Sequence, residues 1–281
     1  MSIAILVLAH KNEEQVNRLV DHLVKDFSIY VHIDKNSKIK IKEQENVYVY
    51  KKYKTYWGSY NIVRATLLLL KKAYENAYNR YLLISGQDLP IKTNEEIKKF
   101  FTENKCEYIF GEKMPVPGVT SNGGLEWVTK YWPNWNLREN KNMLKEKIYR
   151  FERKVLNIIS KIKIRPLDYE FYKGMQWVNF THDCVKKILN YLENDKKYLK
   201  RYKWTNCSDE IFFQTLLNQL KDLHIVNNSL RFVDWESGPE FPRVLRENDY
   251  DRIINSGAIF ARKFDADIDE RIISKIFEKI G

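Results

Sequence analysis

The chain has 281 residues, of which 44% are hydrophobic and 30% charged, so its composition is that of a globular protein rather than a disordered one. Its 48 lysines and arginines exceed the 37 aspartates and glutamates by 11, which favours anionic partners such as nucleotide phosphates, lipid head groups or nucleic acid. The three cysteines are widely separated, which argues against a disulfide framework and against a zinc site.

The N-terminal sequence MSIAILVLAH is apolar, but it lacks a basic leading region and becomes polar too early for a signal peptide. No apolar run approaches the length that crosses a bilayer. Together with the few cysteines, these features predict a cytoplasmic protein.

The first 110 residues alternate buried-type strands with amphipathic helices. This alternation predicts an α/β fold with a Rossmann-like central sheet. The expected strands are 3–9, 28–34, 47–52 and 81–85, and the expected helices are 13–25 and 59–75.

Ligands of such sheets bind beyond the carboxyl ends of the strands. The polar, aromatic and glycine residues that follow the predicted strands, or begin the predicted helix at 59–75, are therefore candidates for nucleotide binding. They are His10, Asp34, Trp57, Gly58, Gly86 and Asp88.

Residues 136–165 carry ten lysines and arginines and only three acids. Apolar residues recur there at spacings of three and four, which predicts a basic amphipathic helix over about 140–163. Two interpretations remain open: a surface helix packed on the domain, or a contact with a membrane surface beside a lipid-linked acceptor. The apolar positions are Leu144, Ile148, Phe151, Val155, Ile158 and Ile162.

The rest of the second half predicts a mixture of strands and helices. We expect one domain, with a nucleotide-binding half at 1–110 and an acceptor-binding and catalytic half at 111–281. The further expected elements are strands at 174–181 and 230–235 and helices at 182–193, 208–220 and 268–280.

Ser208, Asp209 and Glu210 precede the apolar face of the predicted helix at 208–220. Such residues cap a helix and suit its dipole, which is one explanation of the pattern. The other is that one of the carboxylates, kept ionised by the helix N-terminus, removes a proton from an incoming hydroxyl.

Basic residues near the C-terminus are candidates for binding a leaving group. Arg262 and Lys263 end a strand-like stretch, and Arg243 lies twenty residues upstream. Fixed cations stabilise the charge that builds on a departing nucleotide diphosphate. The D-x-D segments at 249–251 and 265–267 do not follow a strand of the first half, so we predict that no metal is bound.

Eight segments occur in an order that resembles the core-2/I-branching β-1,6-N-acetylglucosaminyltransferase family, which includes peptide O-xylosyltransferases. The resemblance spans residues 3 to about 267 and implies a GT-A fold, a UDP-sugar donor, inversion at the anomeric carbon and catalysis without a divalent metal or other cofactor. The segments are AILVLAH, YVHIDKNS, YWGSYNIVRATLLLL, YLLISGQDLPIKT, GMQWVNF, CSDEIFFQTLL, FVDW and SGAIFARKFD.

By this resemblance Glu210 corresponds to the catalytic base. Lys263 corresponds to one pyrophosphate-binding residue, and the second falls on Arg243, with Arg246 as a competitor. Asp34 is expected near the uridine.

Further positions follow from the same resemblance. The Trp57-Gly58-Ser59 and Gly86-Gln87-Asp88 segments match family segments. Candidate acceptor contacts are Trp235, Glu112 and Trp177.

The animal members of the family have a membrane anchor and disulfides, which this sequence lacks, so a bacterial cytoplasmic relative is expected. Residues 110–172 match the family poorly apart from GEKMP, so the animal acceptors are not implied. The expected donor is UDP-GlcNAc, with UDP-xylose as the alternative, and the expected acceptor is a glycan or lipid-linked glycan.

Other classes of protein are weighed against this prediction. A nucleic-acid-binding protein would explain the net charge, but no helix-turn-helix, RNP or zinc-finger signature is found. A glycosidase needs two facing carboxylates, which the neighbours Asp209 and Glu210 do not provide. An inactive transferase retained as a partner protein is the remaining alternative.

Overall fold

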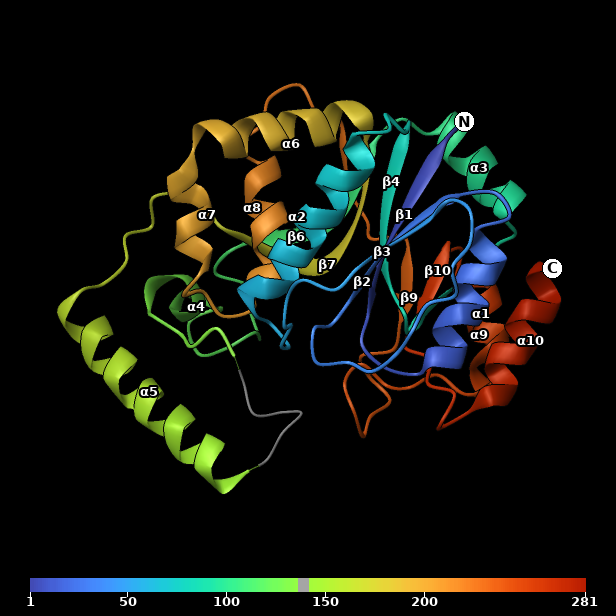
Figure 1. Cartoon of the computed structure of the whole chain (residues 1–281). Helices are drawn as coiled ribbons and strands as arrows, with labels where there is room; N and C mark the ends of the chain where they lie inside the picture. The colour runs from blue at the N-terminus through green and yellow to red at the C-terminus, as the bar shows by residue number, and fades with distance from the viewer. Residues whose placement is uncertain (136–141) are drawn as a thin grey trace.

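The computed structural model describes residues 1–135 and 142–281. Over these residues a central sheet has seven strands in the order β3-β2-β1-β4-β7-β6-β8 (Figure 1). Its first four strands are parallel, as the continuous apolar runs of the first half predict. They are β1 (Ile3–Ala9), β2 (Ser28–Ile33), β3 (Val47–Tyr50) and β4 (Arg80–Ser85).

The other half of the sheet reverses direction once. Strand β7 (Tyr172–Thr181) is antiparallel to both β4 and β6 (Glu107–Lys113), and β8 (Ile225–Asn227) is parallel to β6. The β6–β7 register shifts between Ile109 and Gly111, so the pairing of these two strands is irregular near its middle. The predicted Rossmann-like mixed sheet is confirmed.

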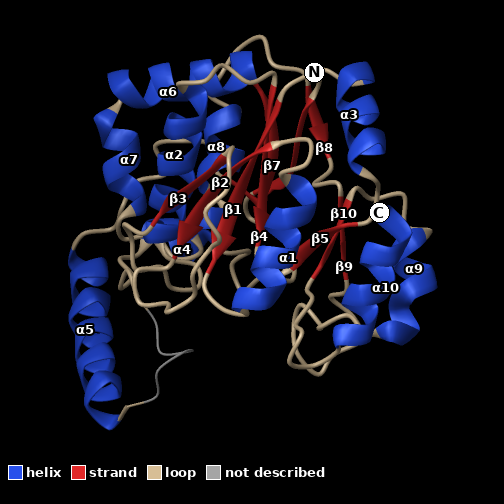
Figure 2. Ribbon diagram, turned by 45° about the vertical axis from the view of Figure 1, so that its right-hand side comes forward, coloured by secondary structure: helices blue, strands red, loops and turns tan. Residues whose placement is uncertain are grey.

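Helices cover both faces of the sheet (Figure 2). Helices α1 (Glu13–Leu23) and α10 (Glu270–Ile280) bury their apolar sides in one core. Helices α2 (Tyr60–Tyr74), α6 (His182–Asn194) and α8 (Phe212–Leu217) contribute to the other. Side chains alternate along a strand, so the odd-numbered residues of β1 belong to the first core and Ala4 and Leu6 to the second.

A small second sheet lies beside the carboxyl end of β4. It consists of β5 (Asp88–Pro90), β10 (Phe260–Arg262) and β9 (Arg231–Val233), with β10 in the middle. Asp88 and Arg262 are paired in its register. This sheet brings the C-terminal basic segment to the end of the central sheet.

The predicted helix over 208–220 is wrong in its extent. A 3₁₀ turn, η1 (Ser208–Glu210), comes first, Ile211 departs from helical geometry, and α8 then ends at Leu217. Glu210 therefore does not lie in the first turn of a long helix, and a helix dipole is not what acts on its carboxylate.

The predicted basic helix is confirmed as α5 (Met143–Ile162), and its predicted first residues, 140 and 141, lie outside the described residues. No helix within the described ranges is both long enough and apolar enough to cross a membrane.

Several short elements were not expected from the sequence. The longest, α3, begins with a capping box in which Thr93 and Glu96 bind each other's backbone amides. Besides α3 (Asn94–Glu103) they include α4 (Leu125–Thr129), α7 (Lys196–Tyr202), η2 (Glu247–Asp249) and α9 (Tyr250–Ile254).

Candidate active site

The loop after β2 is organised by Asp34. The carboxylate accepts hydrogen bonds from the Asn36 amide at 2.7 Å, the Thr55 amide at 2.5 Å and the Thr55 hydroxyl at 2.6 Å. These bonds join the carboxyl end of β2 to the segment that leads to Trp57. Asp34 thus shapes the predicted nucleotide edge, and its direct contact with a uridine stays a prediction.

His32 lies in β2, two residues before Asp34, and has a structural role. Its Nε2 accepts a hydrogen bond from the Tyr53 amide at 3.1 Å, and the two rings stack. Burial lowers the pKa of His32 to about 4, so the ring is neutral at physiological pH and remains an acceptor.

His10 follows β1 and lies at the meeting point of several charges. The residue keeps solvent-exposed surface, but desolvation by the surrounding protein atoms, and then the charge of Lys11, lower its pKa, while Asp34 and Asp265 act in the opposite direction. Arg262 also contributes to lowering it. The sequence-predicted residues of the first half and the C-terminal basic segment are therefore neighbours.

The segment after β10 is bound to the ends of β1 and β4. The Phe264 amide donates to the Gln87 carbonyl at 2.9 Å, and the Gln15 side-chain amide donates to the Gly86 carbonyl at 2.8 Å. Asp265 accepts hydrogen bonds from Lys11 at 2.5 Å and Asn12 at 2.6 Å. Lys11, Asn12 and Gln15 were not singled out in the sequence.

Gly86 and Asp88 shape the turn that follows β4 through their packing in the interior. A Cβ at Gly86 would lie 2.6 Å from a methyl of Val16, so only glycine lets α1 pack here. Asp88 is fully buried and accepts from the Ser85 amide at 2.6 Å; burial raises its pKa, opposed by Arg262 and Arg231. Both positions shape the turn, and their contact with a nucleotide stays a prediction.

The loop before α2 is joined to the turn that carries Glu210. The Ser208 amide donates to the Gly58 carbonyl at 3.1 Å. Gly58 has a positive φ of 65°, and a Cβ there would meet the Cys207 backbone at 3.3 Å. Trp57, beside it, is exposed. Gly58 thus permits the close approach of the predicted nucleotide loop to η1.

Glu210 forms an ion pair with Lys173, with 3.1 Å between the Oε2 and Nζ atoms. Lys173 lies on β7 directly opposite Glu112 on β6, so these two side chains share one face of the ladder. The Lys173 ammonium also lies 5.6 Å from the centre of the Trp127 ring. The predicted base and a predicted acceptor contact therefore meet at a lysine that sequence reasoning missed.

Asp209, the neighbour of Glu210, is buried in the same turn. Burial, and then the charge of Glu210, raise its pKa to about 8. Among the described residues no hydrogen-bond partner reaches its Oδ1. Burial therefore favours the protonated form of Asp209, while Glu210 faces Lys173.

Arg262 connects the two parts of the site. Its Nε lies 3.6 Å from Asp88, and burial lowers its pKa against the opposing charges of Asp88, Glu210 and Asp209. Its guanidinium covers the Trp177 ring at 4.2 Å from the ring centre. Arg262 thus lies near both Asp88, which follows the end of β4, and the predicted base Glu210.

Trp177 does not have the environment expected of an acceptor contact. Only 4% of the residue is exposed, and Arg262 covers its ring. The structure gives Trp177 the task of supporting Arg262 by a cation–π contact. Trp235, by contrast, is 49% exposed and Glu112 is also exposed, as a sugar contact requires.

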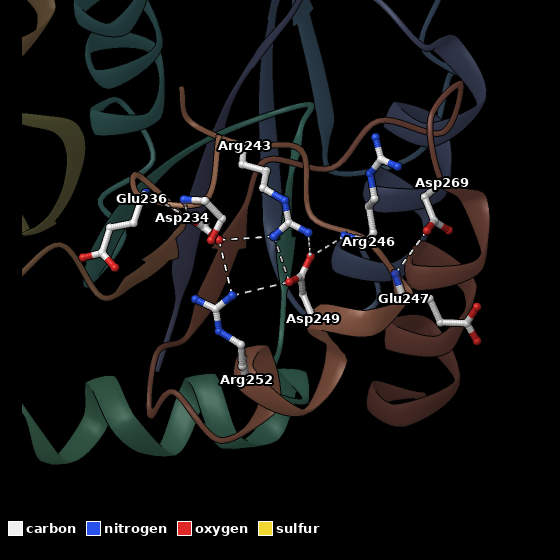
Figure 3. A network of polar contacts seen from close by, with 9 residues as sticks. Asp234, Glu236, Arg243, Arg246, Glu247, Asp249, Arg252 and Asp269 are labelled. Atoms are coloured by element: carbon white, nitrogen blue, oxygen red, sulfur yellow. Dashed lines mark hydrogen bonds and ion pairs between the residues drawn. The ribbon is translucent and has the colours of Figure 1, made fainter. Parts of the chain in front are cut away.

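Arg243 belongs to an ion-pair network that we call the Arg243 cluster, formed by Arg243, Arg252, Asp234 and Asp249 (Figure 3). Arg243 binds both oxygens of Asp249, at 2.9 and 2.8 Å, and Asp234 at 3.2 Å. The hydrogen bond to Asp249 is the first cause of its raised pKa. Figure 3 shows the Arg246 guanidinium turned away from these carboxylates.

This geometry bears on the choice between Arg243 and Arg246 as the second pyrophosphate residue. The Arg243 guanidinium is already paired with two carboxylates. Arg246 contacts Asp249 through its backbone amide, and its guanidinium points away from these carboxylates (Figure 3). The Leu245 amide, adjacent to Arg246, donates to the Lys263 carbonyl at 2.9 Å. Lys263 itself is partly exposed and lies 3.6 Å from Glu240.

The D-x-D segments are engaged in other contacts. Asp249 binds Arg243, and Asp265 binds Lys11 and Asn12. In the part of the chain that the structure describes, no three His, Cys, Asp or Glu side chains are grouped so as to hold a metal ion.

The sheet order, the reversed β7 and the polar groups at the strand ends define an α/β protein with a GT-A-like fold. The sequence model of the Core-2/I-branching enzyme family matches residues 3–254. The chain therefore belongs to this family, as its sequence segments predict.

Two curated relatives are glycosyltransferases of Arabidopsis thaliana. Beta-glucuronosyltransferase GlcAT14B is 23% identical over 77% of this chain and 46% of its own length, and beta-glucuronosyltransferase GlcAT14A is 24% identical over 92% of this chain and 57% of its own. The chain spans about half the length of these relatives. A solved structure, A197 from STIV, is similar only at a TM-score of 0.26 and 10% identity, over 66% of this chain and 68% of its own, which carries no argument.

Proposed function

We propose that this chain transfers a sugar from a UDP-sugar to a glycan hydroxyl with inversion at the anomeric carbon, and that Glu210 is the base. The observation that carries the proposal is the position of Glu210. Its carboxylate lies 3.1 Å from the Lys173 ammonium and close to Arg262, whose segment is bound to the carboxyl ends of the parallel strands. A base thus stands beside the edge at which such sheets bind nucleotides.

In the proposed reaction Glu210 takes the proton of the acceptor hydroxyl while that oxygen bonds to C1 of the donor sugar. The bond from C1 to the diphosphate oxygen breaks in the same step, and its electron pair leaves with UDP. Fixed cations stabilise this developing charge. We assign that task to Arg262 and Lys263, with Arg243 or Arg246 as the second pyrophosphate residue.

The donor nucleotide is proposed to bind at the strand ends. His10 and Trp57 are exposed to solvent there, and Asp34 and Gly58 hold the loop that carries Trp57. Gly86 and Asp88 contribute indirectly: Gly86 lets α1 pack closely, and Asp88 belongs to the small sheet.

The acceptor is proposed to approach from the side of Glu112 and Trp235. Glu112 lies next to Lys173, and carboxylates bind sugar hydroxyls by hydrogen bonds. Trp235 offers an exposed ring face for the apolar side of a sugar. Trp177 contributes through Arg262.

Two donors remain in competition. UDP-GlcNAc is the donor that the sequence resemblance favours, with UDP-xylose as its alternative. The two curated relatives, both beta-glucuronosyltransferases, favour UDP-glucuronate, whose carboxylate would find cations at Lys173 or Arg262.

A panel of these three UDP-sugars, each tested for UDP release with and without EDTA, decides between them. We expect one donor to be turned over and chelation to leave the rate unchanged, because fixed cations take the place of a metal. Loss of the reaction with EDTA and its recovery with Mg²⁺ or Mn²⁺ would refute the metal-independent mechanism. Hydrolysis of none of the donors, with or without an added oligosaccharide acceptor, would count against the proposed transferase.

A further inference from the structure

Helix α5 extends from the body of the protein, beyond the end of the sheet at which the parallel strands finish (Figures 1 and 2). One side of it is fixed. Leu156 is buried, the Ser160 hydroxyl accepts from the Tyr131 amide at 2.9 Å, and the Arg153 guanidinium covers the Trp132 ring. The helix is therefore attached to the domain by a defined face.

A second side of α5, next to the attached one, is apolar and exposed. An α-helix turns by about 100° per residue, so positions spaced by three and four residues share one face. Phe151 is 70% exposed and Ile158 is 51% exposed, although both are large apolar residues. The full stripe, within an arc of about 100°, is Leu144, Ile148, Phe151, Val155, Ile158, Ile159 and Ile162.

Exposed cations flank one edge of this stripe. Lys147, Arg150, Lys154 and Lys161 follow one another along the helix at spacings of three, four and seven residues, beside the apolar positions. Arg150, Lys154 and Lys161 also line a shallow groove on this side of α5. An apolar stripe next to a row of lysine and arginine is the pattern of a helix that lies in the interface of a membrane.

We propose that α5 docks the protein on an anionic lipid surface, with the apolar stripe inserted and the cationic row against the head groups. This inference goes beyond the proposed glycosyl transfer and does not depend on it. Charge complementarity selects this occupant over a second copy of the chain. An antiparallel pair of α5 helices would set each cationic row against its counterpart, and like charges oppose such contact.

The test uses the full chain and flotation with vesicles. We expect wild-type protein to bind vesicles of mixed phosphatidylglycerol and phosphatidylcholine, to bind vesicles of phosphatidylcholine alone much more weakly, and to lose binding as salt is raised. Phe151→Asp places a charge in the stripe and is expected to reduce the partition coefficient about tenfold or more. Replacing Lys147, Arg150, Lys154 and Lys161 by glutamine is expected to have at least as large an effect.

Two matched controls separate the helix from its surroundings. Ile225→Asp changes an exposed apolar residue of β8, and a variant with Lys186, Lys196, Lys197 and Lys200 replaced by glutamine removes the same charge from α6 and α7. Both controls are expected to bind like wild type. Circular dichroism and urea denaturation are used to check that all variants are folded.

Three outcomes would overturn the proposal. The first is equal binding of wild type and Phe151→Asp. The second is equal loss of binding in the charge control and in the α5 charge variant, which would mean that net charge alone is responsible. The third is a wild-type dimer that Phe151→Asp converts to a monomer, which would identify a second copy as the occupant.

Discussion

The Arg243 cluster and the turn that carries Glu210 differ in how completely their charges are matched. In the Arg243 cluster two arginines face two aspartates, and each carboxylate is engaged by at least two donors. In the turn of Glu210 burial raises the pKa of Asp209 and so favours its neutral form, and the Glu210–Lys173 pair stays partly exposed. The matched charges of the Arg243 cluster hold a loop in place, whereas the partly exposed Glu210 remains accessible for the role of base that we propose.

Glu210→Gln is the strongest test of this comparison. It keeps the shape of the side chain but removes the base, so turnover is expected to fall by about 10²- to 10⁴-fold. Because the ion pair with Lys173 is partly exposed, the free energy of unfolding is expected to change by less than about 1 kcal/mol. UDP release and a urea titration measure the two effects, and unchanged turnover would remove Glu210 from its role.

Asp249→Asn tests the other half of the comparison. It breaks a bidentate pair whose carboxylate is 5% exposed and leaves Arg243 poorly matched. The expected loss is about 3 kcal/mol of unfolding free energy, measured by urea denaturation. Asp251→Asn is the matched control, because Asp251 belongs to the same D-x-D segment but is exposed.

A stable Asp249→Asn variant whose activity depends on added divalent metal would contradict this assignment. It would mean that the D-x-D segment serves catalysis rather than the fold. Equal destabilisation by Asp251→Asn would show that the segment's total charge matters and not the bidentate pair.

The sequence predicted most of the strands and helices of residues 1–110 well because their signals are local. The apolar runs of β1, β2 and β4 are long enough to indicate buried parallel strands, and polar residues directly after them fall at one edge by topology. His10 and Asp34 could be placed without any knowledge of tertiary contacts.

The environment of Glu210 could not be predicted in the same way. Lys173 is 37 residues away along the chain and reaches Glu210 only because β7 runs antiparallel between β4 and β6. The break at Ile211 is likewise a tertiary effect, since residues 208–220 have an unbroken helical pattern. The burial of Trp177 under Arg262 carries no local signal either.

Lys173→Met sharpens the account of the base. Without the ammonium the Glu210 carboxylate loses the group that positions it, so kcat is expected to fall by about tenfold to a hundredfold with little change in KM. Lys173→Arg is expected to recover part of the loss. The control is Lys113→Met, which removes an exposed lysine paired with Glu170 at 2.5 Å near the end of the same ladder.

A rise in KM with kcat unchanged would place Lys173 in substrate binding instead. Equal effects of the Lys113 and Lys173 variants would mean that the ladder as a whole, and not the ion pair, sets the rate.

Asp209→Asn is expected to change the stability of the folded protein least at low pH and more as the pH rises. The pKa of Asp209 is raised to about 8 in the folded protein, whereas an unfolded aspartate ionises near 4. Below about pH 4 both states are protonated and the raised pKa costs nothing. As pH rises from about 4 to 8 the unfolded state gives up this proton first, so wild-type stability declines, and above about 8 the deficit is constant.

The asparagine variant cannot ionise, so its stability relative to wild type should increase between pH 4 and 8 and level off beyond. The unmatched amide offsets part of the gain, and we expect a difference in melting temperature of about 3 °C at pH 8.5. Thermal melts at pH 4.5, 6.5 and 8.5 measure it, with Asp251→Asn as a variant whose difference from wild type should not follow this profile. A melting-temperature difference that is the same at all three pH values would mean that Asp209 is ionised throughout, and the distinction between an unmatched acid and a balanced cluster would then fail.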